Sequence, residues 1–155
     1  MTGRVPLSFL DRLIDDSPDT AHEAIENNDT RFERIKLGMR RDLEGLLNSK
    51  QPYTAWGRDE ALGRTITGFG LPDISTEDFG TAAVRERIKR MIATTIRTHE
   101  TRLHGVEVDV DGAPTSAGVR FRISGVIQLA DAAEAVVYDA RLRPSDRVIA
   151  VDLAG

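Results

Sequence analysis

A chain of 155 residues that is 40% hydrophobic and 30% charged has the size and composition of a single globular domain. Because it contains no cysteine, a disulfide framework, a thiol nucleophile and a thiolate metal site are excluded. Its formal net charge of -4 argues against a nucleic-acid-binding surface, which normally needs a basic face.

The first residues do not have the pattern of a secretion signal. Residues 1–14 contain no uninterrupted apolar run, and Asp11 and Arg12 fall inside their short hydrophobic stretch. No segment is long enough to span a membrane as a helix. We therefore expect a cytoplasmic protein without membrane insertion.

A short amphipathic helix is predicted over residues 7–14, where apolar residues recur at helical spacing after Pro6. An isolated helix of this length is marginal in water, so it must dock on the domain or on a partner. The polar residues 15–29, interrupted by Pro18, are typical of a linker. We expect residues 1–28 to form this helix and linker, and residues 29–155 to form one domain.

The clearest helix is predicted to start at Thr30, which forms a capping box with Glu33. It is expected to end near Asn48, because Pro52 follows shortly. Its apolar residues share one face: Phe32, Ile35, Met39, Leu43, Leu46 and Leu47.

A second long helix is predicted from near Asp78 to about His99, with its cap at Ser75 or Thr76. A turn over residues 70–75 precedes it. The apolar stripe of this helix consists of Val84, Ile88, Met91, Ile92, Thr95 and Ile96.

After Leu103 the hydrophobic period changes from helical to two, which indicates strands. The alternation predicts strands over residues 106–110, 119–129 and 136–142, and a last short edge strand over 148–153. Residues 111–118 are expected to form a loop, and Gly125 is the expected position of a β-bulge. Short connections make the strands antiparallel neighbours. The sequence predicts an α+β fold, with N-terminal helices packed against a small C-terminal antiparallel sheet of three to four strands.

No arrangement of residues predicts catalysis, a cofactor or a metal site. His99, Glu100 and His104 lack the spacing of a zinc-protease motif, in which two histidines lie four residues apart. Glu100 is the best single candidate for a general acid. Its neighbour Arg102 favours a structural ion pair instead.

Four stretches occur in the order typical of one known family. They are LSFLDRLIDD at 7–16, RDLEGLLN at 41–48, GFGLPDIS at 68–75 and ETRL at 100–103. Together they resemble TssE, the small baseplate subunit of type VI secretion systems, whose family includes the baseplate wedge protein of contractile phage tails. The family carries Glu-Pro-Arg-Leu at the last stretch, so Thr101 stands in place of a proline that would stiffen this turn.

The resemblance implies a non-catalytic scaffold in the baseplate wedge. Its expected partners are the other wedge subunits and the contractile sheath, on the cytoplasmic side of the inner membrane. It also implies that one family motif forms a structural turn, made of Gly70, Leu71, Pro72 and Asp73.

Two partner-binding features are predicted. A strand at a sheet edge presents unpaired backbone groups that another chain can extend, and Glu100 and Arg102 are expected to fix the helix-to-strand corner beside the sheet. The N-terminal helix is expected to dock on a partner subunit through apolar residues, namely Leu7, Phe9, Leu10 and Leu13.

Three alternatives remain open at this point. The N-terminal helix can instead pack on its own domain. The chain can be a lysozyme-like peptidoglycan hydrolase, which would need a carboxylate with a raised pKa and access to the cell wall. It can also be a small-molecule-binding α+β module, which would need a pocket.

Overall fold

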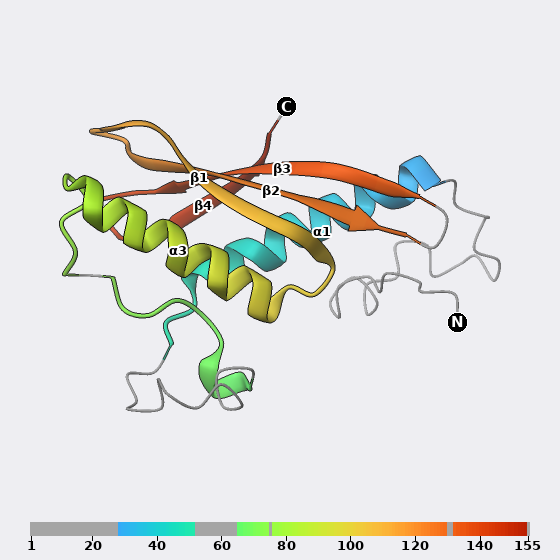
Figure 1. The fold of residues 1–155 in the computed structure, drawn as a ribbon, viewed down its shortest axis with the longest axis horizontal. Coiled ribbons are helices and arrows are strands. Elements are labelled where there is room, and N and C mark those ends of the chain that lie inside the picture. Colours follow the sequence, from blue (N-terminus) through green and yellow to red (C-terminus); the bar gives the residue numbers. More distant parts are fainter. Residues whose placement is uncertain (1–27, 52–64, 75, 130–131, 155) are drawn as a thin grey trace, which may run out of the picture.

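The structure, a computed structural model, describes residues 28–51, 65–74, 76–129 and 132–154 (Figure 1). Two long helices come first and four strands follow. In chain order the elements are α1 (Asn28–Asn48), the short 3-10 helix η1 (Ile66–Gly68), α3 (Ala82–His99), β1 (Leu103–Thr115), β2 (Gly118–Gln128), β3 (Ala133–Leu142) and β4 (Ile149–Leu153). The predicted α+β fold, with helices before an antiparallel sheet, is confirmed.

The four strands form one antiparallel sheet in the order β1-β2-β3-β4, so β1 and β4 are its two edges. Both helices lie on the same side of the sheet (Figure 1). α3 packs mainly against β1, and α1 packs mainly against β4. The described part of the chain is therefore built of two layers, and the opposite face of the sheet carries mostly polar and small side chains, with Val126 as an exposed apolar residue.

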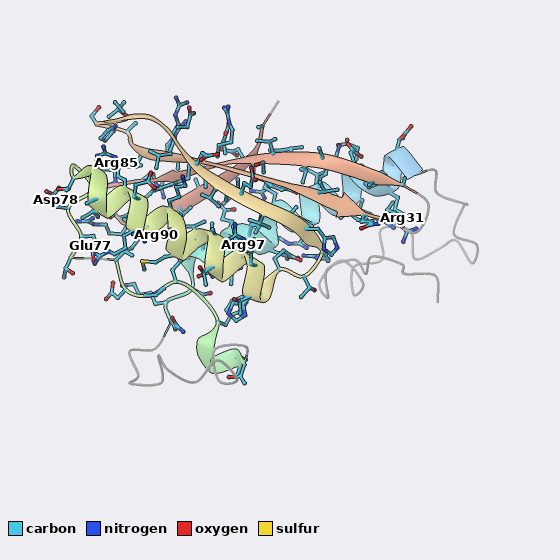
Figure 2. The ribbon with its side chains drawn as sticks, in the orientation of Figure 1. Arg31, Glu77, Asp78, Arg85, Arg90 and Arg97 are labelled. Carbon is cyan, nitrogen blue, oxygen red and sulfur yellow. The ribbon has the colours of Figure 1, made fainter. Side chains whose placement is uncertain are left out.

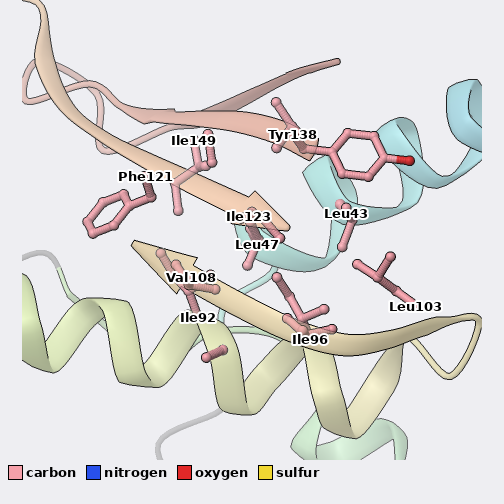
Figure 3. Packing of buried hydrophobic residues seen from close by; sticks show 14 of the residues in the cluster. Leu43, Leu47, Ile92, Ile96, Leu103, Val108, Phe121, Ile123, Tyr138 and Ile149 are labelled. Atoms are coloured by element: carbon pink, nitrogen blue, oxygen red, sulfur yellow. The ribbon is translucent and has the colours of Figure 1, made fainter. Parts of the chain in front are cut away.

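The hydrophobic core fills the space between the helix layer and the sheet (Figure 3). The predicted apolar face of α1 is buried, as are Ile88, Ile92 and Ile96 of α3. The predicted period of two is confirmed along the strands, where inward-facing residues alternate with outward-facing ones. The largest fully buried side chains of the sheet are Phe121, Ile123, Ile127, Tyr138, Leu142 and Ile149.

Both long helices end where predicted but begin elsewhere. α1 begins at Asn28, so Thr30 lies inside its first turn and the predicted capping box is wrong. Asp29 in that first turn is favourable beside the positive end of the helix dipole.

α3 begins at Ala82, after Thr81, and not near Asp78. The Asp78 carboxylate accepts hydrogen bonds from the Gly80 N–H at 2.9 Å and from the Thr81 hydroxyl at 3.3 Å. Arg85 donates to the Gly80 carbonyl at 2.6 Å, and these groups gather at the start of α3 (Figure 2). An aspartate that bonds the backbone two residues later favours a turn over a helix, which delays the helix start.

The first strand is longer than predicted. β1 continues to Thr115, and Thr115 pairs with Gly118. The expected loop over residues 111–118 therefore shrinks to a tight turn at Ser116 and Ala117. The Ala117 N–H donates to the Thr115 hydroxyl at 3.2 Å, which stabilises this turn.

The β-bulge lies in β1 and not at Gly125. Because His104 pairs with Val126 and Glu107 pairs with Ser124, two residues of β1 face the single residue Gly125. Gly105, one of the two, has φ +60, which glycine adopts without strain. A Cβ on Gly125 would lie 2.7 Å from the Leu103 side chain, which explains a glycine opposite the bulge.

The predicted helix over residues 7–14 lies outside the described residues, and the division into residues 1–28 and 29–155 stays a prediction. Within the described ranges, none of the helices combines the length and apolar character required to cross a membrane.

Candidate functional site

The corner between α3 and β1 is built from Glu100, Thr101 and Arg102. The Glu100 N–H donates to the Ile96 carbonyl at 2.8 Å and ends the helix. The Glu100 carboxylate then accepts hydrogen bonds from the Arg102 N–H at 3.1 Å and from Arg102 Nε at 2.8 Å. The guanidinium also contacts the second carboxylate oxygen. The structure thus brings together the two residues that the sequence predicted at this corner.

Asp42 of α1 joins the pair. Its carboxylate accepts a hydrogen bond from the Arg102 guanidinium at 2.6 Å. The side chains of Glu100, Arg102 and Asp42 are 9%, 11% and 24% exposed. Hydrogen bonding to Glu100, and after it to Asp42, raises the pKa of Arg102 above its ordinary value, so the guanidinium stays charged. The cluster ties the start of β1 to the first helix.

Tyr138 lies in the core near this cluster. Its hydroxyl donates to the Lys36 carbonyl of α1 at 3.1 Å. Burial raises the pKa of Tyr138, and the negative charge of Glu100 raises it further. The phenol therefore acts as a neutral link between β3 and α1.

Two charged groups beside the corner, Glu100 and Arg97, are engaged with partners of the same chain. A shallow groove of about 540 Å³ is lined here by Arg97, Glu100, His104 and Glu107, among others. Glu100 uses both carboxylate oxygens for Arg102, and Arg97 donates to the Val106 carbonyl at 3.1 Å. These contacts suit a structural corner better than a general acid, which must be able to give its proton to a substrate.

The structural turn predicted from the family motif is held against the end of α1. The Leu71 N–H donates to the Ser49 carbonyl at 2.9 Å, and the Gln51 N–H donates to the Leu71 carbonyl at 2.8 Å. Gly70 has φ +106, and a Cβ there would lie 2.3 Å from the Ser49 carbonyl oxygen. Only glycine fits this close approach. Pro72 follows, and Asp73 forms an ion pair with Lys50 at 3.8 Å.

The same turn is linked to α3 through His99. The His99 ring nitrogen Nε2 lies 3.0 Å from the Gly68 carbonyl oxygen, and the ring packs edge-on against Phe69. His104 is exposed on β1. Among the described residues, no group of three or more histidine, aspartate or glutamate side chains is placed to hold a metal ion.

The outward-facing edge of β4 is covered by side chains of α1. Hydrogen bonds from the Arg143 N–H to the Val148 carbonyl, and from the Ala154 N–H to the Val137 carbonyl, show which residues of β4 face β3. Because facing alternates along an antiparallel strand, Ile149, Val151 and Leu153 point their backbone groups away from β3.

Two residues of α1 occupy these outward groups. The Asn48 side-chain amide donates to the Ile149 carbonyl at 2.7 Å and accepts from the Ile149 N–H at 2.8 Å, as a neighbouring strand would. Arg40 donates to the Val151 carbonyl at 3.1 Å. The helix therefore blocks the first part of this sheet edge, at Ile149 and Val151.

The opposite edge is more open. Arg97 of α3 binds the Val106 carbonyl at the bulge with two guanidinium nitrogens. Beyond the bulge, residues 107–111 pair regularly with β2. Within the described parts of the chain, no hydrogen bond reaches the backbone of residues 107–111 from outside the sheet. Three acidic side chains follow this edge on the solvent-facing side, namely Glu107, Asp109 and Asp111.

Sequence reasoning found the corner pair and the turn, but it missed Asp42, Asn48, Arg40 and Arg97. The motif at residues 41–48 includes Asp42 and Asn48, yet nothing in it signals a contact with Arg102 or with β4. The sequence identifies Asn48 only as a residue at the end of a helix. The predicted partner-binding residues of the N-terminal helix, Leu7, Phe9, Leu10 and Leu13, lie outside the described residues.

Comparison with known proteins finds one family whose model matches this chain. The family model described as baseplate wedge protein gp25 matches residues 33–132, well over half of the chain. The match runs from the first turns of α1 to the end of the connection before β3. No curated protein and no solved structure matches the sequence. The chain therefore belongs to the gp25 family of baseplate wedge proteins, which is the family of TssE and of phage baseplate wedge proteins.

Proposed function

We propose that this chain is a non-catalytic structural subunit of a type VI secretion baseplate, and that it links wedge subunits to the contractile sheath by β-strand addition. The baseplate wedge family is a structural family, which gives the chain a structural baseplate role. The observation that carries the sheath linkage is the open β1 edge, because an extended segment of another chain can pair with exposed backbone groups there.

The corner cluster supports this role by fixing the start of the open edge. Arg102 holds Glu100 at the end of α3 and Asp42 on α1, so the first residues of β1 cannot shift relative to either helix without breaking buried ion pairs. A rigid edge loses less conformational freedom when a partner strand pairs with it. In this proposal, Glu100 and Arg102 support partner binding by positioning β1.

The wedge contacts are assigned in this proposal to the N-terminal region, through Leu7, Phe9, Leu10 and Leu13. A short apolar stripe at helical spacing is poorly suited to stand alone in water. The proposed location is the cytoplasmic side of the inner membrane, where the baseplate assembles.

Co-purification from the native cells tests this function. The full chain carrying an affinity tag is expected to recover wedge subunits and sheath subunits. Deletion of residues 1–16 is expected to abolish recovery of wedge subunits while the melting temperature stays almost unchanged. A collapse of stability in this variant would show that the N-terminal segment packs on its own domain instead.

The hydrolase alternative has its own assay. Purified chain is incubated with peptidoglycan and turbidity is followed, with Glu100→Gln as the matched variant. We expect no clearing by either protein. Clearing by the wild-type chain that Glu100→Gln abolishes would contradict the non-catalytic role.

A further inference from the structure

The two edges of the sheet differ in how far the chain itself occupies them. At β4, both backbone groups of Ile149 and the carbonyl of Val151 bind side chains of α1. A strand that added to β4 would have to displace Asn48 and Arg40 from these bonds. The α1 side chains therefore block strand addition at this edge, because they occupy backbone groups that an added strand would need.

At β1, the described hydrogen bonds from α3 to the backbone are confined to the bulge, and further along the strand the polar contact from α3 reaches only a side chain, through the ion pair of Lys89 with Asp109 at 3.1 Å. Arg97 takes the Val106 carbonyl, whereas the regular run over residues 107–111 receives no such bond within the described part of the chain. Every second residue of this run points its N–H and C=O away from β2, because facing alternates in an antiparallel ladder. These groups are available for pairing with an extended segment.

The side chains of β1 indicate which segment fits. Glu107, Asp109 and Asp111 lie on the solvent face, and Val108 and Val110 lie on the core face. The neighbouring strand β2 already carries side chains that complement those of β1, basic on the solvent face and apolar on the core face. Arg120 and Arg122 approach Asp111 at 3.5 and 3.9 Å on the solvent face.

On the core face, β2 carries matching apolar residues opposite Val108 and Val110 of β1, namely Ile123 and Phe121. Side chains directly opposite each other on neighbouring strands interact, and opposite charges or apolar pairs are favourable there. A second strand with the alternation of β2 would satisfy β1 from its open side in the same way.

We infer that the sheet accepts a partner strand at β1, over residues 107–111, and excludes one from β4, and that the accepted segment alternates basic residues with apolar residues. This inference rests on the strand addition of the proposed function. It adds which edge is used, which residues close the other edge, and the chemistry of the partner segment.

The chain offers matched positions for a test, because Asp109, Arg122, Asp139 and Asp152 form one row across the solvent face. Asp109 lies on β1, at the open edge, and Asp152 lies on β4, at the edge that α1 blocks. Since the natural chain has no cysteine, Asp109→Cys and Asp152→Cys each introduce a single thiol. The probe is a synthetic peptide with the sequence of residues 118–128 and cysteine in place of Ser124. A scrambled peptide without the alternation is the control.

Disulfide capture of the peptide in a glutathione redox buffer is the measurement. Capture by Asp109→Cys is expected to be at least about tenfold faster than by Asp152→Cys, because several backbone hydrogen bonds are available only at β1. Adding Arg40→Ala and Asn48→Ala to Asp152→Cys is expected to raise its capture rate, with circular dichroism confirming the fold. Equal or faster capture by Asp152→Cys in the otherwise unchanged chain would overturn the edge assignment.

Charge selection is tested at Glu107, which is exposed on the same edge. For this test the peptide cysteine replaces Arg120 instead of Ser124, so that antiparallel pairing with Asp109→Cys places Arg122 of the peptide opposite position 107. Glu107→Lys in the Asp109→Cys chain is expected to slow capture of this peptide, and glutamate in place of its Arg122 is expected to restore capture. Capture that ignores these charges would overturn the partner chemistry. Capture no faster than with the scrambled peptide at either edge would overturn the whole inference.

These outcomes are separate from those of the co-purification. Recovery of sheath subunits without peptide capture leaves the sheath linkage standing and defeats the edge inference. Peptide capture at Asp109→Cys without recovery of sheath subunits supports the edge inference and defeats the sheath linkage.

Discussion

Arg102 is the residue that the corner depends on most. It faces two carboxylates, from Glu100 and Asp42, and its side chain is 11% exposed. Removing one member of a buried ion pair leaves the remaining charge without compensation, whereas an exposed pair contributes little. The ion pairs of Arg102 therefore contribute to the stability of the fold and also hold the first residues of β1, the open edge strand, in place.

We predict that Arg102→Ala lowers the free energy of unfolding by about 2–4 kcal/mol, because the buried Glu100 carboxylate loses the guanidinium that neutralises it. The exposed Arg120 offers a matched control, and Arg120→Ala is expected to cost less than about 1 kcal/mol. Urea unfolding of the two variants measures both values. Equal losses would show that the corner cluster contributes no more than a surface pair.

Gly70 is the second residue whose identity the structure requires. Gly70→Ala combines a left-handed backbone with a Cβ at 2.3 Å from the Ser49 carbonyl oxygen. Gly112 has φ +75 but nothing within 4 Å of its Cβ position, so Gly112→Ala isolates the backbone effect. We expect a loss of about 1 kcal/mol for Gly112→Ala and a clearly larger loss for Gly70→Ala in thermal or urea unfolding. Similar losses would mean that the turn moves freely away from α1.

Because of Tyr138, the free energy of unfolding depends on pH in the alkaline range. Its pKa is raised first by burial and then by the charge of Glu100, so the folded chain keeps the proton where the unfolded chain, with an ordinary pKa of 10.0, has lost it. The free energy of unfolding is therefore unaffected by this group below pH 10 and falls above it. The limiting slope is about 1.4 kcal/mol per pH unit.

Lys36 acts in the same direction. Its pKa is raised by hydrogen bonds to Glu134 and Glu33, so its contribution is also lost only as the pH rises above the ordinary value of 10.5. Tyr138→Phe is expected to reduce the alkaline loss and to leave the Lys36 part. Urea unfolding across neutral to alkaline pH measures the slopes. An unchanged slope in Tyr138→Phe would contradict the assignment.

At the scale of elements, the start of α3 shows how a local hydrogen bond overrides a helical pattern. Asp78 binds the Gly80 N–H and the Thr81 hydroxyl, and Arg85 donates to the carbonyls of Phe79 and Gly80. The capping residues and the apolar stripe alone favour a helix that starts before Ala82. Because the Asp78 side chain bonds the backbone locally, these residues form a turn instead and the helix starts later.

We predict that Asp78→Ala lowers the free energy of unfolding by about 1 kcal/mol, since the Gly80 N–H loses its acceptor at the helix start. Asp78→Asn keeps an oxygen for this bond and is expected to lose less. Thermal unfolding compares the two. A larger loss for Asp78→Asn would indicate that the negative charge matters more than the hydrogen bond.

At the scale of the whole molecule, β4 completes the sheet and packs against the first helix, α1. It contributes Ile149 and Val151, each 1% exposed, and its outer edge is bound by α1. The first helix and the last strand thus depend on each other, although about 100 residues separate Asn48 from Ile149.

Deletion of residues 148–155 is expected to destabilise the domain by at least about 3 kcal/mol, because two fully buried aliphatic side chains are lost and the core face of β3 is exposed. Deletion of residues 1–16 serves as the comparison and is expected to leave the melting temperature almost unchanged. Differential scanning calorimetry reports both. A folded and equally stable chain without β4 would show that the sheet needs only three strands.

The amino-acid sequence by itself determined the two amphipathic helices, the four alternating strands, the α+β class and the family motifs. These features depend on periodicity and on residues adjacent in the chain, which can be seen without a structure. The pairing of Glu100 with Arg102 was also within reach, because the two residues are neighbours.

Only the tertiary structure decided that Asp42 completes this pair, that the bulge lies in β1, and that Asn48 and Arg40 occupy the edge of β4. The bulge depends on the register between two strands, and the other contacts join residues 60 to 111 positions apart. Their geometry follows from how the helix layer packs on the sheet, which no local pattern encodes. The same packing closes one sheet edge and leaves the other open.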